Sequence, residues 1–201
     1  SRPTGLEAKP TRSMFRRPTL SMVGLTRAQS YTVENDGTFK GGGLTIGTSF
    51  RAKTGTISGR DVLPLWSLGK GQNRSVWAAV HLPSLKLVAV KTTDIEETSS
   101  RHQTINEVSV LTSVDRHPNI VGLEGAYVAD GHVKVLLELM NGGNLKQCVR
   151  RHGSFSEDEI RAVSRELLKG LAHLHKSHVL HGDIKPENIL LSKTRGVRLS
   201  D

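Results

Sequence analysis

The stretch that decides the fold is HGDIKPENILL, residues 181–191, which gathers a carboxylate, a cation and an amide in one short run. Transfer of a phosphoryl group needs that set of side chains. A carboxylate such as Asp183 can position the attacking hydroxyl and accept its proton, while Lys185 can offset charge that develops on the phosphoryl group. The side-chain oxygen of Asn188 can bind a magnesium ion. By itself, however, the run is equally well explained as a polar loop between a helix and a strand.

Two further motifs lie upstream, one hairpin apart. Gly69 and Gly71 follow the apolar segment 62–68, and small residues at the end of a strand let backbone amides approach phosphate oxygens. The apolar segment 87–90 then ends in Lys91, whose burial is unfavourable unless it has a negatively charged partner. An ordinary turn and a strand that ends in solvent are the alternatives, and the occurrence of both motifs in this order argues against them.

A helix is predicted over residues 98–114, because apolar residues recur there at three-residue intervals. Glu107 lies beside this apolar stripe, so it can point inward toward Lys91; a solvent-exposed charge is the alternative. The helix is expected to end before Pro118. The apolar positions are Ile105, Val108, Leu111 and Val114.

Local signals predict three more elements. The pair Asp130-Gly131 predicts a turn between strands at 123–127 and 133–140. Ser156 and Glu159 form a capping box that begins a helix, whose buried face is expected to carry Ile160, Val163, Leu167, Leu171 and Leu174. Residues 189–191 and 197–199 are expected to pair as a hairpin. His173, His175 and His178 lack a convincing set of metal ligands, and we interpret them as surface or packing residues.

Together these motifs resemble the eukaryotic protein kinases, whose catalytic loop has His-Arg-Asp, four residues and then Asn. Residues 62–201 carry the glycine loop, strand lysine, helix glutamate, hinge and catalytic loop in order, followed by Asp201 at the place of the Asp-Phe-Gly aspartate. The resemblance implies an α+β fold with the two lobes of a protein kinase, and ATP and Mg²⁺ as cofactors. Lys185 is typical of the serine/threonine-specific catalytic loop.

The resemblance also implies a role for each matching residue. The catalytic residues would be Asp183, Lys185, Lys91 and Glu107, and the metal ligands would be Asn188 and Asp201. Main-chain groups of Glu138 and Met140 would bind the adenine edge, Leu137 would guard the pocket behind it, and Asn144 would reach the ribose. The complete nucleotide-binding set is Leu68, Gly69, Lys70, Gly71, Val76, Ala89, Lys91, Leu137, Glu138, Met140, Asn144 and Leu190.

The chain divides into a tail and linker over residues 1–60, an N-lobe over 61–140 and the beginning of a C-lobe over 141–201. Residues 1–30 hold six basic residues and one acidic residue, which is +5 of the net charge of +9. The positive charge therefore belongs mainly to the tail, which argues against a nucleic-acid-binding face. We expect residues 1–60 to be unstructured except for one short strand at 44–46.

Little in the sequence points to a membrane or an oxidising compartment. The chain has one cysteine, so it cannot form an intramolecular disulfide, and it has no apolar run long enough to span a bilayer. No signal peptide is visible. We therefore expect a protein of the cytoplasm or nucleus.

Within the kinases, the chain most resembles the dual-specificity MAP kinase kinases of the STE type. The segments GLEGAY at 122–127 and LMNGGNL at 139–145 are similar to theirs, as is the GTFK segment at 37–40. In the tail, the pattern of Arg16, Arg17, Leu20 and Met22 taken alone favours a solvated basic tail, but with this resemblance it matches the docking site that holds a MAP kinase. The resemblance implies a MAP kinase substrate, phosphorylated on threonine and tyrosine, and an upstream MAP kinase kinase kinase.

Two positions depart from the kinase pattern. Arg74 replaces the third glycine of the loop, and Gly182 replaces an arginine that pairs with a phosphorylated activation loop. These changes favour a pseudokinase or scaffold, whereas the retained Lys91, Glu107 and Asp183 favour catalysis. Another serine/threonine kinase, similar to MAP kinase kinase kinases or calmodulin-dependent kinases, is the alternative among enzymes. Because the chain stops at Asp201, before an activation loop, we expect it to be inactive and unstable alone.

Overall fold

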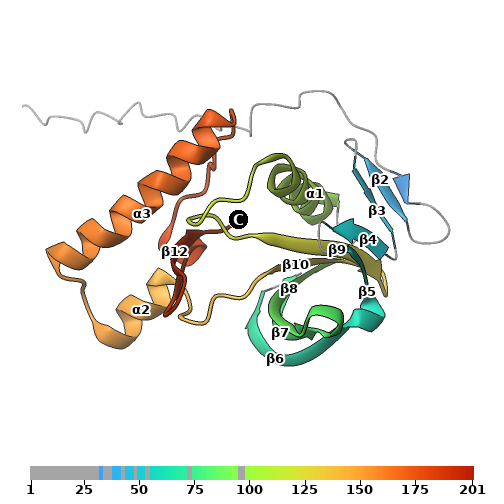
Figure 1. Ribbon diagram of the computed structural model, residues 1–201, viewed down its shortest axis with the longest axis horizontal. Coiled ribbons are helices and arrows are strands. Elements are labelled where there is room, and N and C mark those ends of the chain that lie inside the picture. The colour runs from blue at the N-terminus through green and yellow to red at the C-terminus, as the bar shows by residue number, and fades with distance from the viewer. Residues whose placement is uncertain are drawn as a thin grey trace, which may run out of the picture.

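The structure is a computed structural model, and it has the α+β architecture that the sequence predicts. A twisted sheet with one covering helix forms one part, and two helices with a hairpin form the other (Figure 1). The end of the chain at Asp201 lies between these two parts (Figure 1). The segment 16–22 with the predicted docking motif lies outside the described residues, which are 32–33, 38–41, 44–47, 49–52, 55–71, 74–94 and 98–201.

The main sheet has five strands in the order β6-β7-β8-β10-β9, and every neighbouring pair is antiparallel. Asp130 and Gly131 both have positive φ angles, 54° and 72°, so the predicted turn between β9 and β10 is confirmed. The register of the edge strand β6 shifts just after Pro64, as expected where a proline interrupts the hydrogen-bond ladder. The strands are β6 (Val62–Lys70), β7 (Arg74–His81), β8 (Lys86–Asp94), β9 (Leu123–Ala129) and β10 (His132–Glu138).

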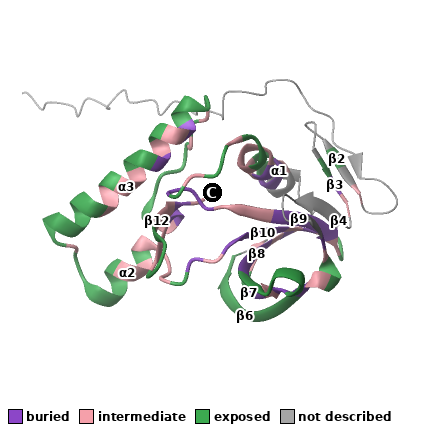
Figure 2. Cartoon of the chain, viewed as in Figure 1, coloured by how far each residue is buried: buried purple, intermediate pink, exposed green. Residues whose placement is uncertain are grey.

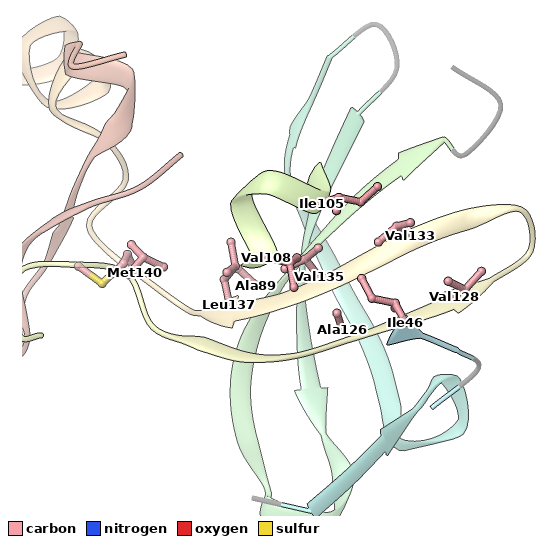
Figure 3. Close-up of a cluster of buried hydrophobic side chains, with 11 residues drawn as sticks. Ile46, Ala89, Ile105, Val108, Ala126, Val128, Val133, Val135, Leu137 and Met140 are labelled. Atoms are coloured by element: carbon pink, nitrogen blue, oxygen red, sulfur yellow. The ribbon is translucent and has the colours of Figure 1, made fainter. Parts of the chain in front are cut away.

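Each face of this sheet buries its own apolar cluster, because successive side chains of a strand point to opposite faces. On one face, helix α1 (Thr98–Ser113) places Ile105 and Val108 against the sheet (Figure 3). On the other face, the cluster consists of Ile57, Val62, Ala79, Val88, Val90, Tyr127 and Leu136. The first face is the one that carries the candidate site.

The expectation that residues 1–60 form an unstructured tail and linker is wrong for the described part of that range. Ile46 and Ile57 are 0% and 1% exposed and belong to the two clusters of the sheet. A Cβ atom on Gly125 would lie 2.5 Å from Cδ1 of Ile57, so the glycine makes room for this packing. The strand predicted at 44–46 is confirmed, whereas the others were not predicted because each is only two to four residues long. The strands are β1 (Thr32–Val33), β2 (Phe39–Gly41), β3 (Leu44–Ile46), β4 (Ser49–Ala52) and β5 (Gly55–Ser58).

The second part packs helix α3 (Glu157–Lys176) against the predicted hairpin of β11 (Ile189–Ser192) and β12 (Gly196–Leu199). The capping box at Ser156 is confirmed, with its N–H 2.8 Å from Oε2 of Glu159. Ile160 is 54% exposed, so the prediction that it belongs to the buried face is wrong. Most of α3 is exposed or half-buried in Figure 2, and its buried residues, Gly170 and Leu174, lie in its later turns. The remaining elements are α2 (Leu145–His152) and the 3-10 turns Gly59–Asp61, Leu82–Ser84 and Pro186–Asn188.

Candidate active site

A buried lysine joins the sheet, helix α1 and the end of the chain. Lys91, on β8, is 5% exposed, and its Nζ atom lies 2.8 Å from Oε2 of Glu107 and 2.9 Å from Oδ1 of Asp201. The helix stripe therefore points Glu107 inward, as the sequence predicts. The contact between Lys91 and Asp201 was not predicted, because nothing in the sequence shows that residues 110 positions apart meet.

Two carboxylates share this single ammonium group, which shapes the protonation of Lys91 and Glu107. Burial alone would lower the pKa of Lys91, but the negative charges of Glu107 and Asp201 outweigh it and raise that pKa. Burial also raises the pKa of the Glu107 carboxyl, and the attraction of Lys91 only partly opposes it. The second oxygen of Glu107, Oε1, is buried without a hydrogen-bond partner among the described residues. Lys91 therefore stays protonated and can bind a negatively charged group.

The catalytic-loop residues form a second, more exposed group. Nζ of Lys185 donates to Oδ2 of Asp183 at 2.5 Å, and Nδ2 of Asn188 donates to the same oxygen at 3.0 Å and to the Asp183 carbonyl at 2.9 Å. The bond from Lys185 is the main reason that the pKa of Asp183 is lowered. Asp183 thus stays ionised near neutral pH, and its half-exposed carboxylate can accept a proton from a bound hydroxyl.

Ser200 connects the two groups. Its carbonyl oxygen lies 3.0 Å from Nε2 of His181, and its N–H donates to the Asn188 carbonyl at 2.9 Å. The residue before Asp201 is therefore fixed to both ends of the catalytic loop, while Asp201 itself contacts Lys91. Sequence reasoning missed this link, since Ser200 belongs to no motif.

The predicted nucleotide-binding residues that are apolar pack in or against one buried cluster. Ala89, Leu137 and Met140 belong to one buried cluster (Figure 3), and Val76 and Leu190 pack against it. The N–H of Glu138 donates to the Gly122 carbonyl at 2.9 Å, so an adenine edge could meet the carbonyl oxygen of Glu138 but not its N–H.

Asn144 has a local role that the sequence analysis missed. Its side-chain oxygen accepts from the N–H of Gln147 at 2.8 Å, and this bond caps helix α2. The signal was the spacing of Asn and Gln three residues apart, which is typical of a capping box. A ribose contact would have to come from the remaining amide nitrogen.

The glycine loop begins at the end of β6, which carries the half-exposed Leu68 followed by Gly69 and Lys70. The N–H of Gly71 donates to the Arg74 carbonyl at 2.7 Å and so joins the end of β6 to the beginning of β7. Arg74, at the place of the third glycine, donates from its guanidinium group to the side-chain oxygen of Gln103 on α1. The only signal in the sequence for the contact of Arg74 with Gln103 is that Gln103 lies one helical turn before Glu107.

Two oxygen-bearing side chains at the meeting point fit a magnesium ion. Both Asn188 contacts use its Nδ2 atom, which leaves Oδ1 as a ligand, and Lys91 contacts only one of the two carboxylate oxygens of Asp201. Mg²⁺ prefers oxygen ligands and is commonly held by one or two protein groups together with phosphates and water. Among the described residues, no cluster of three or more His, Cys, Asp or Glu side chains offers a metal site made of protein alone.

Comparisons with known proteins agree with this geometry. Residues 65–201 match the protein kinase domain family. The chain is 39% identical over 137 residues to the serine/threonine-protein kinase STE20 of Saccharomyces cerevisiae, which covers 68% of this chain and 14% of that protein. It is 37% identical over 134 residues both to MST20 of Pyricularia oryzae and to dst1 of Dictyostelium discoideum, and covers 14% and 18% of them. The matched region thus spans less than a fifth of these relatives.

Within the part of the chain that the structure describes, no helix is long and apolar enough to cross a membrane.

Proposed function

Since the chain belongs to the protein kinase family, we propose that the protein transfers the γ-phosphoryl group of ATP to threonine and tyrosine side chains of a MAP kinase in a cytoplasmic or nuclear signalling cascade. The observation that carries the kinase activity is the convergence of Lys91, Glu107 and Asp201 beside the catalytic loop. Phosphoryl transfer requires these three side chains together with Asp183 and Asn188. They come from β8, α1, the catalytic loop and the end of the chain, and a purely structural role does not account for their convergence.

ATP supplies the phosphoryl group and Mg²⁺ neutralises its negative charge when they are bound. The ammonium group of Lys91 would orient the phosphates, while Glu107 holds that ammonium in place. Asp183 would accept the proton of the attacking hydroxyl at its carboxylate, and Lys185 would offset charge on the transferring group. Oδ1 of Asn188 and the carboxylate of Asp201 would hold the metal ion.

The MAP kinase substrate is supported by resemblance in sequence. Segments 122–127 and 139–145 are similar to those of MAP kinase kinases. Arg16, Arg17, Leu20 and Met22 would hold the MAP kinase, with the arginines on an acidic patch and the apolar side chains in small pockets. In this proposal an upstream MAP kinase kinase kinase activates the protein.

A second candidate is a serine/threonine kinase that acts like STE20, with no tyrosine phosphorylation. The identity of 37–39% to STE20, MST20 and dst1 favours it, because all three carry the description serine/threonine-protein kinase. The two candidates differ in substrate and in the residue that is modified, so one assay separates them.

The assay incubates the full-length protein with radiolabelled ATP, Mg²⁺ and a catalytically inactive MAP kinase, and then identifies the labelled residues. The proposal expects both phosphothreonine and phosphotyrosine on the MAP kinase. Phosphoserine or phosphothreonine on a general basic substrate, with no label on the MAP kinase, would support the STE20-like candidate instead. Equal labelling by the wild type, Lys91→Met and Asp183→Asn would exclude kinase activity of this site.

The docking motif has its own test. Replacing Arg16 and Arg17 together by alanine should raise KM for the MAP kinase while kcat and KM for ATP stay unchanged, because the motif lies outside the reacting groups. An unchanged KM for the MAP kinase would show that the tail does not hold the substrate.

A further inference from the structure

A cavity of about 690 Å³ lies away from the catalytic loop. The loop after α1, the beginnings of β8 and β9, and the turn between β11 and β12 contribute to its lining. We call it the arginine cavity, because Arg116, Arg195 and Arg198 line it. Leu85 and Leu87, which are 81% and 50% exposed, give it an apolar side. The cavity therefore combines positive charge with accessible apolar surface.

Two guanidinium groups converge on one buried carboxylate in this cavity, and a third pairs with a neighbouring carboxylate. Arg195 and Arg198 both pair with Glu138, the latter at 2.8 Å. Gly122 lies between the two pairs, since a Cβ atom there would be 3.6 Å from Oε2 of Glu138 and 3.8 Å from Cζ of Arg116. Arg116 pairs with Glu124 at 3.3 Å. Three cations thus share two carboxylates, which leaves positive charge unbalanced.

The positive charge is also the part of the cavity that solvent reaches. The side chains of Arg116 and Arg195 are 54% and 49% exposed, whereas those of Glu124 and Glu138 are 14% and 9% exposed. Lys86 adds a further cation to the lining, and Asp115 is its one remaining acid. A ligand that enters the cavity therefore meets guanidinium groups first.

One donor in the cavity has no acceptor within the described chain. Nη1 of Arg198 bonds to Glu138 and to the Ile120 carbonyl at 3.2 Å, but its Nε atom is buried with no hydrogen-bond partner. Buried donors without acceptors are rare and unfavourable in folded proteins. The cavity therefore combines excess positive charge with an arginine whose buried Nε atom is unsatisfied.

We propose that the arginine cavity binds an acidic peptide segment of a partner protein, with its carboxylates on Arg116 and Arg195 and an apolar side chain against Leu87. Guanidinium groups bind carboxylates through paired hydrogen bonds, and the neighbouring leucines explain why the ligand needs an apolar residue as well. The chain's own residues 1–30 do not fit, because their net charge of +5 would be repelled. This binding does not depend on catalytic activity.

The cavity also touches the edge of the nucleotide site. Glu138 directs its side chain to the arginines and its backbone N–H to Gly122, and its backbone carbonyl is the group that we expect to meet adenine. A peptide that draws Arg195 or Arg198 away from Glu138 would therefore act on the residue that links the two sites.

The proposal is tested by fluorescence anisotropy with the full-length protein and a short labelled peptide of alternating Glu and Leu residues. We expect saturable binding that the double variant Arg116→Ala/Arg195→Ala weakens by about tenfold or more, since hydrogen bonds to charged groups are lost. Leu87→Ala should weaken it severalfold. Arg161→Ala is the matched control, because Arg161 is also an exposed arginine in an ion pair, with Asp158 on α3. It should bind like the wild type.

Three results would overturn the proposal: equal binding by the double variant, equal binding of a Lys-Leu peptide, or equal binding of a peptide of Glu and Ser. Displacement of the peptide by inorganic phosphate at low concentration would also overturn it in favour of a small-anion site. If the double variant does not fold in thermal melting, Arg195→Glu, at a half-exposed position, takes its place. Peptide-induced protection of residues 192–198 from hydrogen exchange, absent in that variant, is the supporting result.

Discussion

The two halves of the candidate site are built in different ways. Lys91 is held by groups from α1 and from the end of the chain, and its side chain is 6% exposed. Asp183 has its partners within five residues, and its side chain is 55% exposed. The buried half depends on tertiary packing, whereas the exposed half depends on local backbone conformation. Substitutions in the first should therefore alter both stability and activity, and substitutions in the second mainly activity.

Lys91→Met should have the largest effect. Activity of the full-length protein should be lost, because the phosphates lose their cationic partner. The change also leaves Glu107 and Asp201 together without a cation, and breaking a buried ion pair costs on the order of 3 kcal/mol. Chemical denaturation of the chain measures the second effect.

A double substitution separates charge from packing in that result. Because Glu107 is the more buried carboxylate, Lys91→Met with Glu107→Gln should recover part of the lost stability but none of the activity. If Lys91→Met unfolds at the same denaturant concentration as the wild type, the buried half is no more dependent on packing than the exposed half.

Asp183→Asn should separate the two properties. The phosphorylation rate should fall by about 10²–10⁴-fold, which is the usual contribution of a general base. Stability should change by less than about 0.5 kcal/mol, because the side chain is half-exposed and has few contacts. Rate and denaturation midpoint are measured on the same preparation. A large loss of stability would mean that the loop is held by Asp183 and not by its backbone.

Gly182→Ala tests the backbone of the exposed half. Gly182 has a φ angle of +77°, a conformation that costs an ordinary L-residue about 1–2 kcal/mol. A Cβ atom there would meet nothing within 4 Å, so only backbone strain opposes the substitution. The unfolding free energy should fall by about 1 kcal/mol. Gly69→Ala is the matched control, since it has equal space and no positive φ, and it should change stability less.

The sequence predicted the exposed half better than the buried half. Asp183, Lys185 and Asn188 lie close in the chain, so their proximity followed from a short motif. The pairing of Lys91 with Glu107 could be proposed only from spacing on a helix and from resemblance to a family. The contact of Lys91 with Asp201 depends on the path of the whole chain, and no local pattern encodes it.

The same distinction applies to the fold. Turns and caps, such as those at Asp130-Gly131 and Ser156, were found because each depends on a few adjacent residues. Ile57 was missed because its burial depends on Gly125, a distant residue that leaves space for it. Ile160 has the helical spacing of a buried residue, but spacing does not show where the packed surface begins.

The smallest predicted effect is a dependence of stability on pH that arises where the two parts of the molecule pack together. His117, in the loop after α1, stacks on His173 of α3 with ring centroids 4.6 Å apart. Nδ1 of His117 accepts from the Asn119 N–H at 3.1 Å, an arrangement that requires an unprotonated nitrogen. Burial, His173 and Arg198 lower the pKa of His117, while Glu166 opposes them and Lys169 adds to them.

Because the folded protein resists this proton, the unfolded chain binds it first as pH falls below about 6.5. The free energy of unfolding should therefore decrease as the pH falls from about 6.5 to the lower pKa of folded His117. Below that pKa both states bind the proton, and His117 contributes no further change. Solvent screening at a half-exposed stack should keep the effect below about 1 kcal/mol. In His117→Asn the side-chain oxygen can accept the same hydrogen bond without titrating. The denaturation midpoint of this variant should therefore vary less between pH 7.5 and 5 than that of the wild type. Burial also lowers the pKa of His181, and that part of the pH dependence should remain in the variant, so only the difference between the two profiles reports on His117. Identical profiles would mean that the stack does not couple the two parts through protonation.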